Sequence, residues 1–217
     1  AEGTVVSTSD QYAGIGQRSN AWESEPNKNI SLSVILYPGF LNVKDQFRLN
    51  QVIALALFYT IDAYLPQRVT IKWPNDIYIG DKKVAGVLVQ NQVQGQKMAS
   101  AIIGIGININ QERFVSDAPN PVSLYNELGH YLDLGEFRKI LFENLTQQYR
   151  ALQLGAHIEL NAAYLKYLYR FGELCKYEIA DQQIVSGTIV GINAYGNLQV
   201  HIDGATFEFG FKEIRYL

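Results

Sequence analysis

The sequence predicts an α+β protein, in which a mixed β-sheet backed by helices is followed by a small C-terminal β-barrel. Two observations support this fold class. Strand patterns and helix patterns are interspersed up to about residue 171, whereas beyond Gly172 only short strands and glycine-containing turns remain. With 217 residues, the chain is long enough for one domain and a small appendage. We therefore expect a main domain of residues 1–171 and a barrel domain of residues 172–217.

The strands of the main domain are predicted from alternation and from turn residues. In residues 29–38, apolar residues alternate with Ser31 and Ser33, which is typical of a strand with one buried face. Three further strands are expected at 69–79, 82–93 and 97–109. The first of them is interrupted at Pro74. The turns "GD" and "QGQ" between these strands contain the glycine that tight hairpins favour.

Helices are predicted where apolar residues recur at intervals of three and four. We expect helices at residues 44–65, in a short segment capped by Ser123, and at residues 136–154 and 159–170. The first is apolar on most sides in "VIALALF", so it should be buried. Pro66 should end it.

The composition limits the kinds of function. A formal net charge of -3 gives no basic surface for nucleic acid. No apolar run approaches the ~20 residues that a membrane-spanning helix needs, so no membrane partner is expected. Cys175 is the only cysteine, which fits a core residue in a reducing, cytoplasmic compartment. The three histidines lack zinc spacing, so any metal would arrive with a substrate.

The motif "KWPND" at 72–76 places polar residues where a strand should continue. Pro74 removes a donor from the strand ladder, and Asn75 and Asp76 favour turns and bulges. The strand should therefore break here and direct side chains out of the regular pleat. A bulge without chemistry would also explain the motif, and Lys83 in the following "DKK" could be an ordinary solvated lysine.

Two further motifs contain pairs of glycines. "GIGIN", residues 104–108, would let a flat ligand approach the backbone, and Asn108 offers both a donor and an acceptor to the edge of a base. Tight sheet packing explains these glycines nearly as well. "QYAGIGQRSNAW", residues 11–22, carries Arg18 and has the composition of a loop that folds over a ligand.

In this order and spacing, the motifs resemble those of biotin–protein ligases, of the monofunctional type without a DNA-binding domain. The loop at 11–22 resembles the family's "GRGRRG…W" element, and "KWPND", "KKVAG" and "GIGIN" are similar to its adenylation core. The segment "GTIVGINAYGNLQV", residues 187–200, resembles its C-terminal barrel. The resemblance therefore extends over almost the whole chain and implies that residues 1–171 form a biotin/lipoate ligase-like catalytic domain.

The resemblance also implies a role for each matched residue. Lys83 and Arg18 would be catalytic. The biotin-binding residues would be Gln11, Gly14, Gly16, Arg18, Lys83, Gly86, Gly104 and Gly106. The ATP-binding residues would be Trp22, Asn75, Asp76, Lys83 and Asn108. Asp76 would also face the Mg²⁺ that accompanies ATP.

These assignments imply an enzyme that uses ATP and Mg²⁺. Biotin would be activated as biotinyl-AMP and then transferred to a lysine of the biotin carboxyl carrier protein of a biotin-dependent carboxylase. Lys83 and Arg18 suit this chemistry because the carboxylate and the phosphate are both anions. An exposed edge of the main sheet would also permit a homodimer.

Departures from the family pattern leave two alternatives open. Ile15 and Ser19 stand where the family has an arginine and a glycine, and the family's upstream Ser-Thr element has no counterpart here. We therefore expect that the catalytic domain lacks its N-terminal part or that its site is incomplete, in which case the chain would be a non-catalytic biotin- or nucleotide-binding relative. The other alternative is a lipoate or octanoate ligase or transferase of the same fold, against which "KWPND" and Trp22 argue.

Overall fold

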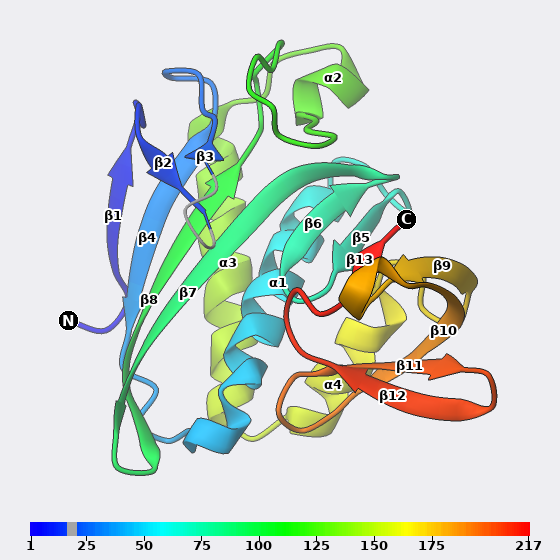
Figure 1. The fold of residues 1–217 in the computed structure, drawn as a ribbon. Helices are drawn as coiled ribbons and strands as arrows, with labels where there is room; N and C mark the ends of the chain where they lie inside the picture. Colours follow the sequence, from blue (N-terminus) through cyan, green and yellow to red (C-terminus); the bar gives the residue numbers. More distant parts are fainter. Residues whose placement is uncertain (17–20) are drawn as a thin grey trace.

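The computed structural model describes residues 1–16 and 21–217. Its main element is a six-stranded sheet with the strand order β1-β4-β8-β7-β6-β5 (Figure 1). The strands are β1 (Thr4–Thr8), β4 (Ile30–Leu36), β5 (Val69–Lys72), β6 (Asp76–Ile79), β7 (Lys82–Gln94) and β8 (Lys97–Ile107). Their ladders are antiparallel, and parallel bridges join Ile71 to Leu168 and Lys83 to Pro121.

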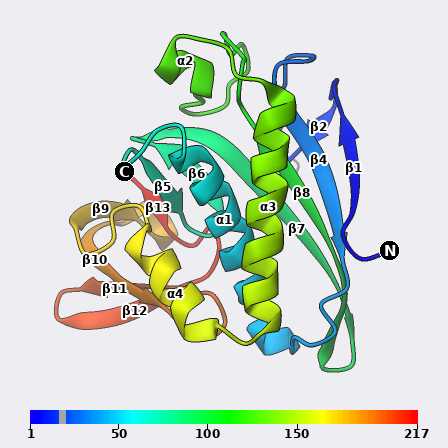
Figure 2. The ribbon, with the colours of Figure 1, turned by 180° about the vertical axis from the view of Figure 1, so that it is seen from behind.

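Helices cover one face of this sheet, as Figure 2 shows from behind. They are α1 (Phe47–Asp62), α3 (Leu134–Gln153) and α4 (His157–Lys166), with the short α2 (Leu124–Leu128) near one end of the sheet. The apolar face of β4 and almost the whole of α1 are buried in the core between sheet and helices. Within the described ranges, no helix combines the length and the apolar character that a membrane crossing requires.

The predicted helices are confirmed, with shifted ends. α1 begins three residues later than expected because Val43–Asp45 form a short 3₁₀ turn, η2. Ser123 caps α2 as predicted: its side chain accepts a hydrogen bond from the Asn126 N–H, and the Asn126 side chain reciprocates. Asp133 caps α3 in a similar way, which places the start of that helix two residues before the predicted position.

The interruption at Pro74 differs from the expected single broken strand. β5 and β6 are separate antiparallel strands with Lys72 opposite Asp76, so Trp73, Pro74 and Asn75 reverse the chain. Proline cannot donate to a ladder and asparagine favours turns, which is why a reversal is possible here. The Trp73–Pro74 peptide bond is cis. A bulge is also present, but it lies in the neighbouring strand β7. The register with β6 shifts there, since Ile77 lies opposite Ala85 whereas Tyr78 lies opposite Lys83.

The C-terminal segment forms the expected small β domain. Its strands are β9 (Leu174–Glu178), β10 (Ile184–Ile192), β11 (Leu198–Ile202), β12 (Ala205–Phe209) and β13 (Arg215–Tyr216), with the short turn η3 (Ala180–Gln182) before β10. The strand order β12-β11-β10-β9-β13 places β12 and β13 at opposite ends, so the hydrogen-bonded ladder is an open sheet. Trp73 is buried, and its Nε1 donates to the Gly196 carbonyl oxygen at 2.9 Å. This bond ties the β5–β6 turn to the C-terminal sheet.

Candidate active site

The sheet face opposite the helices is lined by small residues. Antiparallel register aligns the side chains of neighbouring strands in rows across a sheet. Two adjacent rows are Gly86–Gly106–Ser31–Thr8 and Leu88–Gly104–Ser33–Val6. Because glycines and serines occupy the middle of both rows, the sheet surface forms a shallow trough there. We use "glycine floor" for Gly86, Gly104 and Gly106.

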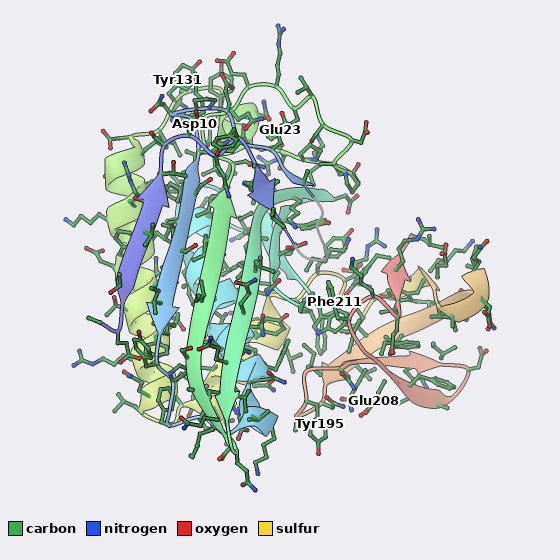
Figure 3. The ribbon with its side chains drawn as sticks, turned by 60° about the vertical axis from the view of Figure 1, so that its left-hand side comes forward. Asp10, Glu23, Tyr131, Tyr195, Glu208 and Phe211 are labelled. Carbon is green, nitrogen blue, oxygen red and sulfur yellow. The ribbon has the colours of Figure 1, made fainter. Side chains whose placement is uncertain are left out.

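The trough is the floor of a cavity of about 410 Å³. One wall is the two-stranded hairpin of β2 (Gly14–Ile15) and β3 (Ala21–Trp22), and another is the turn between β5 and β6. The loop between β12 and β13 contributes Phe211 and Lys212. Figure 3 shows Phe211 on the side of the C-terminal sheet that faces the main sheet. The cavity has the size of a small-molecule site and is bordered by segments from both ends of the chain.

The indole of Trp22 lies directly on the glycine floor. A Cβ atom added to Gly106 would lie 2.4 Å from Trp22 Cε2, and one added to Gly86 would lie 3.2 Å from Trp22 Cζ3. Gly14 permits the equivalent approach within the hairpin, since its added Cβ would lie 2.6 Å from the Trp22 carbonyl oxygen. These glycines are therefore required for the hairpin to bring Trp22 down onto the sheet.

Lys83 and Asp76 form the charged end of the cavity. Lys83 Nζ lies 2.8 Å from Asp76 Oδ2, with the two side chains 30% and 27% exposed. The same Nζ lies 5.8 Å from the ring centroid of Trp22, within the range of a cation–π interaction. The backbone of Lys83 is held by hydrogen bonds to Asn120 and Val122, so the base of this side chain is anchored. A fixed cation next to a carboxylate suits a ligand that brings both phosphate and metal.

Several buried polar atoms at the cavity lack a hydrogen-bond partner within residues 1–16 and 21–217. They are Ser31 Oγ, Asn75 Oδ1 and Trp22 Nε1. Asn75 is only 1% exposed, and its Nδ2 donates to Asn50 Oδ1 at 2.7 Å, which fixes the amide and leaves its oxygen unpaired. A buried polar atom without a partner costs about 1–3 kcal/mol. A polar ligand that pairs with these atoms would therefore recover part of that free energy.

Lys72 adds positive potential beside this end of the cavity. Burial lowers the pKa of Lys72, while the Asp76 carboxylate acts in the opposite direction. Lys72 Nζ donates to Tyr78 Oη at 3.1 Å, and burial raises the pKa of Tyr78. Repulsion from Lys83 contributes to the lowered pKa of Lys72. Two lysines therefore converge on Asp76, and such a field attracts an anionic ligand.

Most of the site residues predicted from the sequence line this cavity. They are Gln11, Gly16, Trp22, Asn75, Asp76, Lys83, Gly86, Gly104 and Gly106. Gly14 is buried beneath Trp22 and so supports the hairpin. Asn108 is 3% exposed and does not line the cavity; its Nδ2 donates to the Val122 carbonyl oxygen at 3.2 Å, and its part in base recognition stays a prediction. Arg18 lies outside the described residues.

Several lining residues were not assigned to the site from the sequence, among them Ser31, Ser33, Phe211 and Lys212. A signal existed for the serines, because alternation along residues 29–38 puts both on the face opposite the core. Pairing of that strand with the "GIGIN" strand would have placed them beside the glycines. The sequence carries no comparable signal for Phe211 and Lys212, because only the docking of the C-terminal sheet brings them here.

Residues 1–108 match the family model described as Biotin/lipoate A/B protein ligase family. The chain is 40% identical over 111 residues to the bifunctional ligase/repressor BirA of Bacillus spizizenii, in an alignment that covers 51% of this chain and 34% of the relative. It is 30% identical over 172 residues to the biotin--[acetyl-CoA-carboxylase] ligase of Paracoccus denitrificans, covering 76% of this chain and 70% of the relative. The chain thus spans about a third of the length of the two Bacillus relatives it matches.

The fold is also found among solved structures. The biotin protein ligase from Aquifex aeolicus, solved in complex with biotin and ATP, superposes with a TM-score of 0.82, 23% identity and coverage of 100% of this chain and 90% of that chain. At this identity the likeness shows the fold. The Paracoccus ligase, at 30% identity and with 70% of its length covered, shows the family. The chain therefore belongs to the biotin protein ligases of the biotin/lipoate A/B protein ligase family.

Proposed function

We propose that this chain is an ATP-dependent biotin protein ligase, which forms biotinyl-AMP and transfers the biotinyl group to a lysine of a carrier domain. The observation that carries the proposal is the arrangement of one cavity. It has a glycine floor, a cover formed by Trp22, and Lys83 beside Asp76 at one end. Membership of the biotin protein ligases supports the same activity.

The cavity suits the two ends of biotin. Biotin has an uncharged bicyclic head and a carboxylate at the end of an alkyl chain. The backbone at Gly104 can be approached closely by a ring system, since an added Cβ there would lie 3.6 Å from Leu88 Cβ, an ordinary contact, and the Trp22 indole on Gly106 borders this space. The ammonium of Lys83 provides a cation for the carboxylate. We therefore place the head over Gly104, beside Trp22, and the carboxylate toward Lys83.

In the first reaction, a carboxylate oxygen of biotin attacks the α-phosphorus of ATP. The bond between that phosphorus and the bridging oxygen breaks, and pyrophosphate leaves. Both reactants are anions, so the Lys83 ammonium lowers the barrier by stabilising the charge on the phosphoryl oxygens in the transition state. A cavity that holds the carboxylate in line with the phosphorus also removes the entropic cost of a two-body encounter.

In the second reaction, the uncharged ε-amine of a carrier lysine attacks the acyl carbon of biotinyl-AMP. An amide bond forms, the amine loses a proton and AMP leaves. Water would compete with the amine for the same carbon. Trp22 and its hairpin cover the trough and so exclude water from the acyl-adenylate, which is the role we assign to this segment.

Mg²⁺ would enter this site together with ATP. Proteins usually hold Mg²⁺ through one or two carboxylates, with phosphate oxygens and water completing the shell. Asp76 fits this pattern because its carboxylate lines the cavity at the charged end. No cluster of three or more His, Cys, Asp or Glu that could hold a metal ion is found in the described part of the chain. When bound, Mg²⁺ would neutralise charge on the phosphates, and Asp76 would be its protein ligand.

The partner in this proposal is a biotin carboxyl carrier domain, because the Paracoccus relative is named as a ligase for acetyl-CoA carboxylase. β1 offers a place for a protein partner to pair. It is an end strand of the six-stranded sheet, and all five of its residues are exposed. Edge strands invite pairing with another strand, so a second copy of the chain or a hairpin of the carrier could extend the sheet here.

ATP–pyrophosphate exchange, followed by transfer of labelled biotin to a carrier domain, tests the proposal. We expect exchange that depends on biotin and Mg²⁺, and labelled carrier after its addition. Lipoate and octanoate should support neither step. Exchange with lipoate in place of biotin would favour a lipoate ligase. Biotin binding without exchange would favour a non-catalytic relative, in which Ile15, 66% exposed on β2, is the first residue to restore to arginine.

A further inference from the structure

We propose that Ser31 is a specificity-determining residue whose hydroxyl hydrogen-bonds the cyclic urea in the head of biotin. This inference rests on the proposed function and extends it to one more residue of the same cavity. The urea presents one carbonyl acceptor and two N–H donors, and a serine hydroxyl can pair with either kind of group.

The register of the sheet places Ser31 next to the glycine floor. Ser31 lies opposite Gly106 on one side and Thr8 on the other, in the row that begins with Gly86. Its side chain lies on the same face as these residues, because Ile30 and Leu32 on either side of it point into the core. Because the Trp22 indole itself rests on Gly106, a ligand ring would lie over Gly104 and would have Ser31 as its diagonal neighbour on β4, about 7–8 Å away between backbone positions.

The hydroxyl of Ser31 is buried and has no protein partner. Ser31 is 6% exposed, and its Oγ has no hydrogen bond within the described part of the chain. The neighbouring Thr8 differs, because its Oγ1 donates to the Asp10 carbonyl oxygen at 2.6 Å. Buried hydroxyls in native proteins are almost always paired, so an unpaired one that lines a cavity indicates a ligand as its partner.

The distribution of charge assigns Ser31 to the uncharged end of the ligand. The charged residues lining the cavity, within the described ranges, are Asp76, Lys83 and Lys212. None of them is on β4 or β1. Ser31 is separated from β7, which carries Lys83, by β8, so about two strand spacings or ~10 Å lie between those strands. If the carboxylate is at Lys83, the group near Ser31 is the neutral polar head.

The test is the variant Ser31→Ala, studied by calorimetric titration with biotin and separately with ATP. We expect biotin to bind about tenfold more weakly, the loss of one neutral hydrogen bond, and ATP to bind within about twofold of wild type. In the absence of ligand, the variant should melt about 2–4 °C higher, because it no longer buries an unpaired hydroxyl. If Ser31 had a purely structural role, its replacement by alanine would instead lower the melting temperature.

Thr70→Val is the matched control. Thr70 Oγ1 on β5 is likewise buried without a partner among the described residues, but Thr70 does not line the cavity. This variant should also gain thermal stability while its affinity for biotin stays unchanged. Wild-type affinity for biotin in Ser31→Ala, or an equal loss of biotin and ATP affinity, would overturn the inference. A wild-type protein that fails to bind biotin would instead overturn the proposed function and this inference with it.

Discussion

At the scale of single residues, the two adjacent lysines of β7 lie in different environments because the backbone directs their side chains to different sides of the strand. Lys82 is exposed and lies outside the cavity lining, whereas Lys83 lines the cavity and contacts Asp76. Successive residues of a strand point to opposite faces, and the adjacent bulge directs Lys83 toward the β5–β6 turn. Similar residues in sequence therefore have different environments.

We predict that Lys83→Ala lowers the rate of biotin-dependent ATP–pyrophosphate exchange by about 10²–10³, the usual effect of removing one preorganised group that stabilises transition-state charge. Lys82→Ala should retain wild-type exchange, since its side chain is in solvent. The assay is exchange of labelled pyrophosphate at saturating ATP and biotin. Equal rates for Lys83→Ala and Lys82→Ala would remove Lys83 from the mechanism.

Two glycines of the floor should respond differently to alanine. A Cβ atom at Gly106 would lie 2.4 Å from the Trp22 ring, whereas one at Gly104 would meet Leu88 Cβ at 3.6 Å, an ordinary contact. We predict that Gly106→Ala displaces Trp22 and weakens biotin binding by about tenfold or more, while Gly104→Ala leaves Trp22 in place. Tryptophan emission in a Trp73→Phe background reports on Trp22. An unchanged emission spectrum in Gly106→Ala would contradict the contact.

The residue-level predictions from sequence succeeded where a motif defines both the residue type and its neighbours. Lys83, Gly86 and Gly106 were identified in this way, and they do share one cavity. Ser31 was not identified, because a serine in a strand is ordinary until the register with β8 is known. Register depends on pairing between distant segments, and local sequence does not encode it directly.

At the scale of elements, the clearest difference between expectation and structure is the turn at Pro74. Alternation on both sides predicted one interrupted strand, because the two halves carry the same period. The reversal depends on interactions that the local sequence does not contain. Tyr164 of α4 donates from its Oη to the Pro74 carbonyl oxygen at 2.7 Å, and Asn50 of α1 pairs with Asn75 at the same distance. Helices behind the sheet thus fix the turn that carries Asp76.

Removing one of these supports should lower stability. Tyr164 is fully buried, so Tyr164→Phe would leave the Pro74 carbonyl without this donor at a cost of about 1–3 kcal/mol. We expect the melting temperature to fall by several degrees, measured by circular dichroism. Tyr195→Phe is the control, because Tyr195 is 71% exposed and should be neutral. Equal melting temperatures for the two variants would show that the Tyr164 hydroxyl does not support the turn.

At the scale of the whole molecule, buried tyrosines should control stability at alkaline pH. Burial raises the pKa of Tyr164 and Tyr177, and it raises the pKa of Tyr169 to about 12. Between pH 10 and 12 the unfolded chain loses these protons while the folded chain keeps them. The folded state then binds more protons, so its stability falls as pH rises. Burial lowers the pKa of Lys72, so this residue makes the folded state more stable as pH rises, but its effect is smaller than that of several tyrosines together.

We therefore predict that the melting temperature declines steadily from pH 10 to pH 12. Absorbance at 295 nm, which reports tyrosinate, should rise in step with unfolding for the buried tyrosines and before it for exposed ones. A melting temperature that stays constant over this range would contradict the raised pKa values.

The division of the chain near residue 172 can be predicted from the sequence, because helix patterns end there and only short strands follow. The contacts between the two parts cannot be predicted in this way. Trp73 reaches from the β5–β6 turn to the Gly196 carbonyl oxygen, and Phe211 packs against Trp73 with ring centroids 6.1 Å apart. These contacts join residues more than a hundred positions apart. They also place Phe211 and Lys212 at the cavity, so docking of the C-terminal sheet completes the proposed site.

Gly196 allows a direct test of this docking. It adopts a φ of +94°, and an added Cβ atom would lie 2.5 Å from the Phe47 ring at the start of α1. Gly204 in the β11–β12 turn has a similar φ of +85° with nothing within 4 Å of an added Cβ. Both alanine variants bear the left-handed strain of about 1–2 kcal/mol, but only Gly196→Ala adds a steric conflict worth about 1–3 kcal/mol. The difference between the two free energies of unfolding isolates the contact with Phe47.

We expect Gly196→Ala to be the less stable variant in urea titrations and to bind ATP more weakly, since the loop with Lys212 would move away from the cavity. Gly204→Ala should lose some stability and keep its ATP affinity. If both variants lose stability equally and bind ATP alike, the C-terminal sheet does not dock through Gly196 and Phe47. The cavity would then have to be completed by the main domain alone.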